Sequence, residues 1–143
     1  MITNVYASVH IDGVLDRGSL KVGVLDERPS HDAPPTPVVF FRVVTGLQRH
    51  PVWAIGSIAA KVYCYCQAAG EQEQDEIEVS LTGNLVSGDK AVCVVAANIV
   101  WHTSKLVRSL AETRISAMMA SGCGPSWLDQ WPSHEAIGML TRA

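Results

Sequence analysis

The chain has 143 residues, of which 48% are hydrophobic and 17% are charged. This length and composition fit one globular domain with a hydrophobic core, and they argue against extensive disorder. No apolar run approaches the roughly 18 residues of a membrane-spanning helix, and the N-terminus lacks the pattern of a secretion signal. We therefore expect a cytoplasmic protein without a membrane anchor.

The net charge is −3, and the eleven Lys and Arg residues are spread thinly along the chain. A surface that tracks phosphates needs clustered basic side chains, because affinity scales with the number of phosphates neutralised. The charge therefore lowers the affinity expected for nucleic acid. It still permits a single basic face on a protein that is acidic elsewhere.

Cysteine and histidine spacing predicts no metal site. The cysteines form no paired CxxC-like sets, and the five histidines show no HxH or HExxH pattern. We expect buried free thiols at Cys64, Cys66, Cys93 and Cys123. The sequence also lacks a Gly-rich phosphate loop and a GxSxG elbow, so we expect neither a cofactor nor an enzyme.

Strand patterns dominate the first third of the chain. Residues 4–16 alternate between apolar and polar side chains, as in a half-buried strand, and Gly13 predicts a bulge or bend within it. A turn at residues 17–19 is expected to lead into a short second strand at 20–25. After a proline-rich loop, residues 38–45 predict the third strand.

Residues 51–70 read as one helix. Pro51 occupies the position of a first helical residue, and Gly70 that of the residue just past the end. Apolar residues fall at helical spacing on one face, at Ile55, Ile58, Ala59, Val62, Cys66 and Ala69. Residues 62–66 also alternate as in a strand, and this alternative stays open at this stage.

The second half predicts a hairpin followed by a helix. A strand from Ile77 and an apolar strand at 91–101 flank a tight turn at 87–90. Thr103 is the expected N-cap of a helix. Its apolar stripe consists of Val107, Leu110, Ala111, Ile115 and Met118. A further short helix is expected around residues 135–140.

A strand, a helix and a hairpin of two long strands are typical of the back half of an OB-type barrel. The predicted fold is mainly β, a five-stranded OB-fold barrel with a helix between strands 3 and 4 and a C-terminal helical extension. We expect the barrel to span residues 1–103, with the C-terminal helix and a Trp-containing tail at 104–143. Open strand edges of such a barrel favour assembly into a dimer or tetramer.

Three segments, residues 40–44, 79–85 and 94–100, resemble the bacterial single-stranded DNA-binding protein family and its primosomal relatives. The resemblance covers roughly residues 5 to 101. It implies a non-enzymatic protein that binds single-stranded DNA rather than RNA, with a role in DNA replication.

The resemblance also implies a binding site. It gives Phe40 the position of a base-stacking aromatic and Arg42 that of a cation on the nucleic-acid backbone. Strand alternation independently places Phe40 and Arg42 on one face, with Phe41 and Val43 in the core. The predicted nucleic-acid-binding residues are Arg17, Lys21, Arg28, Phe40, Arg42, Arg49 and Trp53. Trp53, expected to open the helix, also fits a role as a core anchor.

Some residues depart from the family pattern. Ser80 stands where an outward aromatic is usual, Glu78 adds a negative charge to the same face, and the following hairpin is short. These departures favour an alternative, an OB-fold structural or protein-interaction module that has lost nucleic-acid binding. Trp127 and Trp131 would then anchor a protein partner, although they could equally dock on the barrel.

Overall fold

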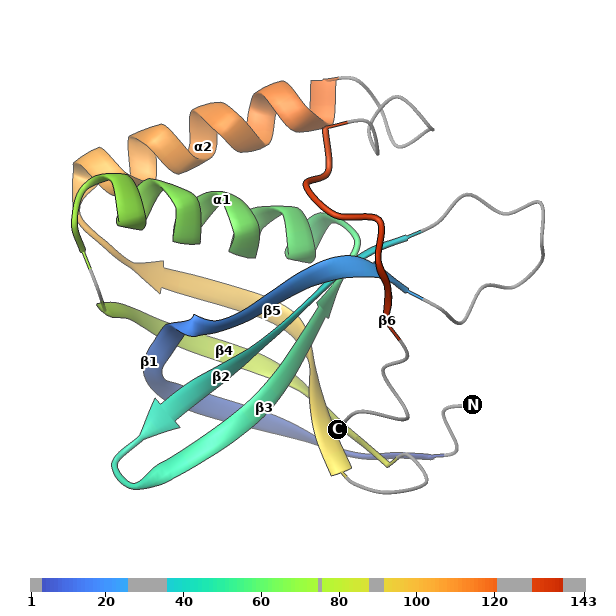
Figure 1. The fold of residues 1–143 in the computed structure, drawn as a ribbon. Coiled ribbons are helices and arrows are strands. Elements are labelled where there is room, and N and C mark those ends of the chain that lie inside the picture. The colour runs from blue at the N-terminus through green and yellow to red at the C-terminus, as the bar shows by residue number, and fades with distance from the viewer. Residues whose placement is uncertain (1–3, 26–35, 75, 88–91, 121–129, 138–143) are drawn as a thin grey trace.

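The computed structural model describes residues 4–25, 36–74, 76–87, 92–120 and 130–137. Two helices lie together over one end of a β-barrel (Figure 1). The elements in chain order are β1 (Asn4–Leu25), β2 (Pro37–Thr45), β3 (Gln48–Ile55), α1 (Ser57–Glu71), β4 (Glu76–Ser87), β5 (Val92–His102), α2 (Lys105–Ala120) and β6 (Ala136–Ile137). Within these residues, neither helix has the length and apolar character needed to cross a bilayer.

The strands form a closed five-stranded barrel with an added sixth strand. Their order is β2-β3-β5-β4-β1-β6, and a further pairing of β2 with β1 closes the barrel. This arrangement, with α1 between β3 and β4, confirms the predicted OB fold. The predicted boundary between a barrel and a C-terminal unit at residue 103 stays a prediction.

β1 is one long strand where the sequence predicted two. The expected turn at residues 17–19 is a local irregularity in the pairing with β2, between Asp16 and Lys21. Asp16 Oδ1 accepts the Gly18 amide at 3.0 Å, and the Ser19 hydroxyl donates to the Asp16 carbonyl at 2.6 Å. These short-range bonds satisfy the polar groups of the irregular stretch, so the strand continues through it.

Gly13 marks the corner at which β1 begins to pair on both sides. From Val14 onward β1 pairs with β2, while its pairing with β4 continues. A Cβ atom at Gly13 would lie 2.5 Å from the Val44 carbonyl oxygen and 2.8 Å from Thr45 Oγ1. Only glycine therefore allows this approach of the two strands, and the predicted bend is confirmed.

β3 was missed by the sequence reading, which placed residues 51–55 in the helix. Pro51 lies within β3, opposite Arg42 of β2. The Arg42 amide donates to the Ser19 hydroxyl of β1 at 2.8 Å and so points away from β3. Arg42 and Pro51 consequently form a non-hydrogen-bonded pair. Pro51 has no amide hydrogen, but at this position that costs the β2–β3 ladder no hydrogen bond.

The two helices extend the core of the barrel. α1 begins at Ser57, after Gly56 turns the chain with a φ of 68°, and residues 62–66 are helical. The predicted stripe of α2 is buried or half-buried. Ser104, rather than Thr103, caps α2, because its hydroxyl accepts the Val107 amide at 3.2 Å.

A stacked pair of rings joins the barrel to α1. The rings of Tyr65 and Trp101 lie 4.3 Å apart with an interplanar angle of 1°, and the Tyr65 hydroxyl donates to Glu112 of α2 at 2.8 Å. The three described cysteines are free and buried, as predicted, at Cys64, Cys66 and Cys93. Cys123 lies outside the described residues.

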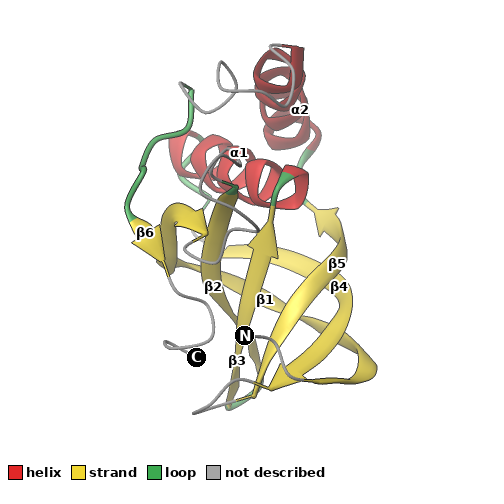
Figure 2. Cartoon of the chain, turned by 90° about the vertical axis from the view of Figure 1, so that its right-hand side faces the viewer, coloured by secondary structure: helices red, strands yellow, loops and turns green. Residues whose placement is uncertain are grey.

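The described C-terminal segment returns to the barrel. Where the sequence predicted a helix from residue 135, Ala136–Ile137 forms β6, which pairs in parallel with Val24 and Leu25 of β1 (Figure 2). Trp131 is buried and docks on the barrel through a hydrogen bond from its indole nitrogen to the Gly23 carbonyl, at 2.7 Å. Trp127 lies outside the described residues.

Candidate nucleic-acid interface

The outer face of β2 and β3 collects most of the predicted binding residues. Strand alternation places Val39, Phe41 and Val43 in the barrel core, where each is fully buried, so the prediction for Phe41 and Val43 is confirmed. Phe40 and Arg42 therefore lie on the outside of the barrel wall. In the pairing register Phe40 stands opposite Trp53 of β3 on one side and Lys21 of β1 on the other.

Three cations border this face. The side chains of Lys21, Arg42 and Arg49 are exposed, and in the described parts of the chain none of them forms an ion pair. Arg49 stands opposite Val44 in the β2–β3 register and shares the outer side with Pro51 and Trp53. These side chains give the face a positive charge despite the net charge of −3 on the whole chain.

The Arg42 guanidinium lies over the Phe40 ring. Its central carbon is 5.4 Å from the ring centroid, a cation–π distance. Phe40 in turn packs on Trp53, with the ring centroids 4.9 Å apart and an interplanar angle of 58°. The result is a cluster of a cation and two mutually tilted rings, in which Arg42 is the exposed member.

The two aromatic rings themselves are covered. Phe40 is 9% exposed and Trp53 is 1% exposed. They belong to an apolar cluster on the outside of the barrel, which we call the outer cluster and which consists of Val38, Phe40, Trp53, Val86, Cys93 and Ile137. A cavity of about 70 Å³ remains between Lys21, Phe40, Arg42, Trp53 and Ile137.

The hairpin tip beyond this face exposes an apolar side chain. Gly46, with a φ of 60°, makes the tight turn between β2 and β3, and Leu47 next to it is fully exposed. Arg49 follows two residues later on the same hairpin. The tip thus offers an apolar contact beside a cation, a combination that suits an unstacked base on a charged backbone.

Arg17 does not join the face. Its guanidinium lies against the last turn of α1, because a Cβ atom at Gly70 would be 2.7 Å from an Arg17 nitrogen. Arg17 also lies close enough to the Cys66 thiol to lower its pKa slightly, although burial dominates and raises that pKa to about 12. Arg28 lies outside the described residues.

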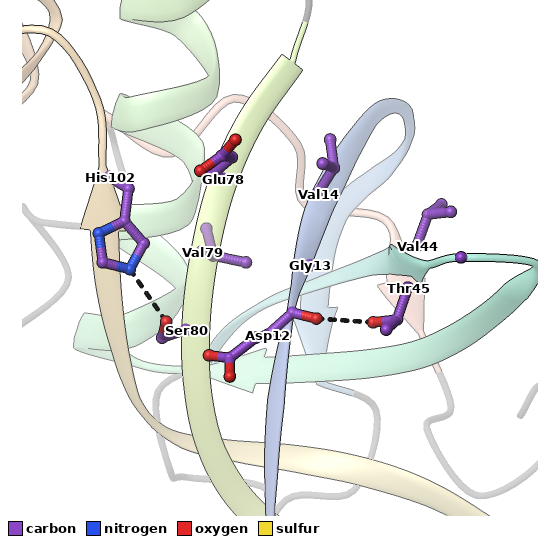
Figure 3. Close-up of a pocket in the computed structure, with 10 residues that line it drawn as sticks. Asp12, Gly13, Val14, Val44, Thr45, Glu78, Val79, Ser80 and His102 are labelled. Atoms are coloured by element: carbon purple, nitrogen blue, oxygen red, sulfur yellow. Dashed lines mark hydrogen bonds between the residues drawn. The ribbon is translucent and has the colours of Figure 1, made fainter.

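A larger, open cavity of about 460 Å³ is lined by residues of β1, β4 and β5 and by the end of β2 at its turn (Figure 3). Its polar lining includes Asp12, Thr45, Glu78, Ser80 and His102, from four different strands. The Thr45 hydroxyl donates to the Asp12 carbonyl at 2.7 Å, and the Ser80 oxygen lies 2.9 Å from His102 Nε2. Most of these polar groups are therefore hydrogen-bonded to one another.

The charge of this cavity disfavours phosphate. A hydrogen bond with Ser80 is the largest cause that holds the pKa of the Asp12 carboxyl below its ordinary value, and His10, 2.9 Å away, adds to it. Asp12 is thus ionised at neutral pH, and Glu78 adds a second carboxylate to the lining. A polyanion is repelled here, whereas the cations on the outer face of β2 and β3 attract it.

Two parts of the candidate site were not visible in the sequence reading. Ile137 reaches the outer cluster from a strand of two residues, which is too short for a periodic signal. Arg49 and Trp53 lie on β3, a strand that the apparent helix start at Pro51 concealed. Trp53 therefore reaches the site from a strand, not from the opening turn of a helix.

Comparison with solved structures finds nine matching chains, which include an SSB domain. The crystal structure of an SSB domain from Synechococcus sp. aligns with a TM-score of 0.42 and 17% sequence identity, over 70% of this chain and 99% of that one. No protein-family model matches the chain. No curated protein matches it either.

Proposed function

We propose that this protein binds single-stranded nucleic acid, DNA rather than RNA, through the outer face of β2 and β3. The observation that carries the proposal is the Arg42 guanidinium over the Phe40 ring, with Lys21 and Arg49 exposed on the same outer side of the barrel. This face is the one with which OB barrels bind oligonucleotides. Its cations are uncommitted among the described residues, so they can neutralise phosphates without breaking an ion pair.

Binding would combine two contributions. Each cation that neutralises a phosphate releases a counterion, which makes affinity fall with salt. A base stacked on a planar side chain contributes about 1–3 kcal/mol and accepts any sequence, because every base has a π-face. The Arg42 plane, the Phe40 ring and the exposed Leu47 are the groups on which bases would pack.

The test is fluorescence anisotropy of a labelled oligo-dT of about 30 nucleotides, long enough for several sites of OB size. We expect binding at low salt that a duplex does not compete away, and weaker binding to oligo-rU. The variant Phe40→Leu/Arg42→Gln should lose affinity by about tenfold or more, since one stacking contact and one phosphate contact disappear. A folded double variant that binds as tightly as the wild type would show that the face is wrong.

A second candidate function is a protein-interaction module without nucleic-acid binding. The burial of Phe40 and Trp53 favours it, because neither ring is open to a base in this conformation. Absence of binding to oligo-dT at micromolar protein and low salt would support this candidate. Assembly into a dimer or tetramer is part of both candidates, and analytical ultracentrifugation measures it.

A further inference from the structure

The C-terminal strap, which we define as residues 130–137, lies on the face that the proposed function assigns to nucleic acid. Two of its hydrogen bonds join it to β1. The Val24 amide donates to the Glu135 carbonyl at 2.8 Å, and the Trp131 indole donates to the Gly23 carbonyl at 2.7 Å. Figure 2 shows β6 alongside the barrel wall.

Ile137 is the strap residue that packs in the outer cluster. Ile137 is 2% exposed and belongs to the outer cluster with Phe40 and Trp53. In the described part of the chain, it is the member of that cluster that comes from outside the five barrel strands. The cavity left beside it, about 70 Å³, holds on the order of two water molecules. A nucleobase, which is as large as an aromatic side chain, does not fit while Ile137 is in place.

Gly23 is the residue that lets the strap lie so close to β1. A Cβ atom there would collide with the Glu135 carbonyl oxygen and would lie 2.6 Å from Ile137 Cδ1. The close approach therefore depends on a residue of β1 as well as on the strap. This gives a way to displace the strap without changing any residue of it.

The strap buries a side chain near each end, and the Glu135 carbonyl between them accepts a hydrogen bond from β1. Trp131 and Ile137 are buried, whereas His134, Glu135 and Ala136 are exposed. β6 contributes only two residues of parallel pairing, and the barrel closes through β1 and β2 without it. Release of the Ile137 end thus leaves the barrel strands paired.

The closed state also leaves a donor unpaired. The Trp53 indole nitrogen is buried and has no hydrogen-bond partner within the described residues. A buried donor without an acceptor is unfavourable. An oxygen of a base or phosphate that entered the space of Ile137 would supply an acceptor, so this side chain favours an occupied site.

We propose that the strap is an intramolecular competitor of single-stranded nucleic acid, with Ile137 occupying the position of a stacked base on Phe40 and Trp53. This inference rests on the proposed function of the β2–β3 face. Nucleic acid binds after the Ile137 end of the strap leaves, and the affinity of the intact chain is reduced by the cost of that release.

Two variants displace the strap in different ways. Ile137→Ser removes the side chain that seals the outer cluster, and Gly23→Ala introduces the Cβ that collides with the strap. Both should bind oligo-dT at least about tenfold more tightly than the wild type, the effect expected for one buried aliphatic side chain. Ile115→Ser on α2 is the matched control, because it removes an equally buried isoleucine away from this face.

The outcomes separate the inference from the function on which it rests. If the wild type and both strap variants bind equally, the competition is refuted while the proposed function stands. If none of the proteins binds at low salt, the proposed function fails and the inference fails with it. Thermal melts establish that each variant is folded.

Hydrogen exchange tests the release in the unaltered protein. The Val24 amide is bonded to the strap, so its exchange should accelerate when oligo-dT binds, whereas amides of β2 and β3 should exchange more slowly. Continued protection of Val24 in the bound protein would overturn the inference.

Discussion

The salt dependence of binding is set by the cations of the β2–β3 face. Single-stranded nucleic acid releases counterions so that log K falls with log salt by about 0.7 per neutralised phosphate. The uncommitted side chains of Lys21, Arg42 and Arg49 therefore predict a slope of about −2 from this face. Arg42→Gln should reduce the magnitude of that slope by about 0.7, and Lys21→Gln should have the same effect.

Anisotropy titrations with oligo-dT at four or five salt concentrations measure these slopes. Lys61→Gln is the control, because Lys61 is an equally exposed cation that lies on α1. Its slope should equal that of the wild type. An unchanged slope for both Arg42→Gln and Lys21→Gln, in folded proteins, would refute the assignment of phosphate contacts to this face.

Three predictions concern the barrel and the two helices that cover it. Gly13→Ala should lower the free energy of unfolding by about 1–3 kcal/mol, because its Cβ would meet the Val44 carbonyl; an unchanged denaturant midpoint would contradict the role of this corner. Hydrogen bonding to Arg114, 2.6 Å away, lowers the pKa of Glu71 from its ordinary value of 4.5. The pair therefore stabilises the fold above pH 4.5. This stabilisation is lost as the pH falls through the lowered pKa. Glu71→Gln should therefore narrow the difference in stability between neutral and acid pH, and an unchanged difference would argue against the pair. Burial raises the pKa of the Cys66 thiol to about 12, so native protein at pH 8 should resist alkylation there and react only when unfolded, as peptide mapping would show.

The sequence predicted the fold class because its strongest patterns coincide with its longest elements. The run of β-branched and aromatic residues at 38–45 and the apolar run of β5 both predict strands from the local sequence alone. β3 escaped because its outer side chains, Trp53 and Ile55, are as apolar as its inner ones, Val52 and Ala54. Because the two sides of β3 do not differ in polarity, Pro51 was read as the first residue of a helix.

The candidate site was only partly predictable for a related reason. Phe40 and Arg42 follow from their positions within one strand, and the structure places two other predicted residues, Lys21 and Trp53, beside them. Arg17 was assigned by its charge alone, whereas contact with the end of α1 decides where its side chain lies. The covering of Phe40 by Ile137 joins positions almost a hundred residues apart, and no local pattern encodes such a contact.

The most direct test of the account is to cross-link a bromodeoxyuridine-substituted single strand of about 30 nucleotides to the wild-type protein and map the modified peptides. We predict that cross-links concentrate on β2 and β3, at or beside Phe40 and Trp53, and that they diminish as salt is raised. Cross-links confined to the acidic cavity around Asp12 and His102, or none at protein concentrations that saturate binding, would contradict the claim that the β2–β3 face binds nucleic acid.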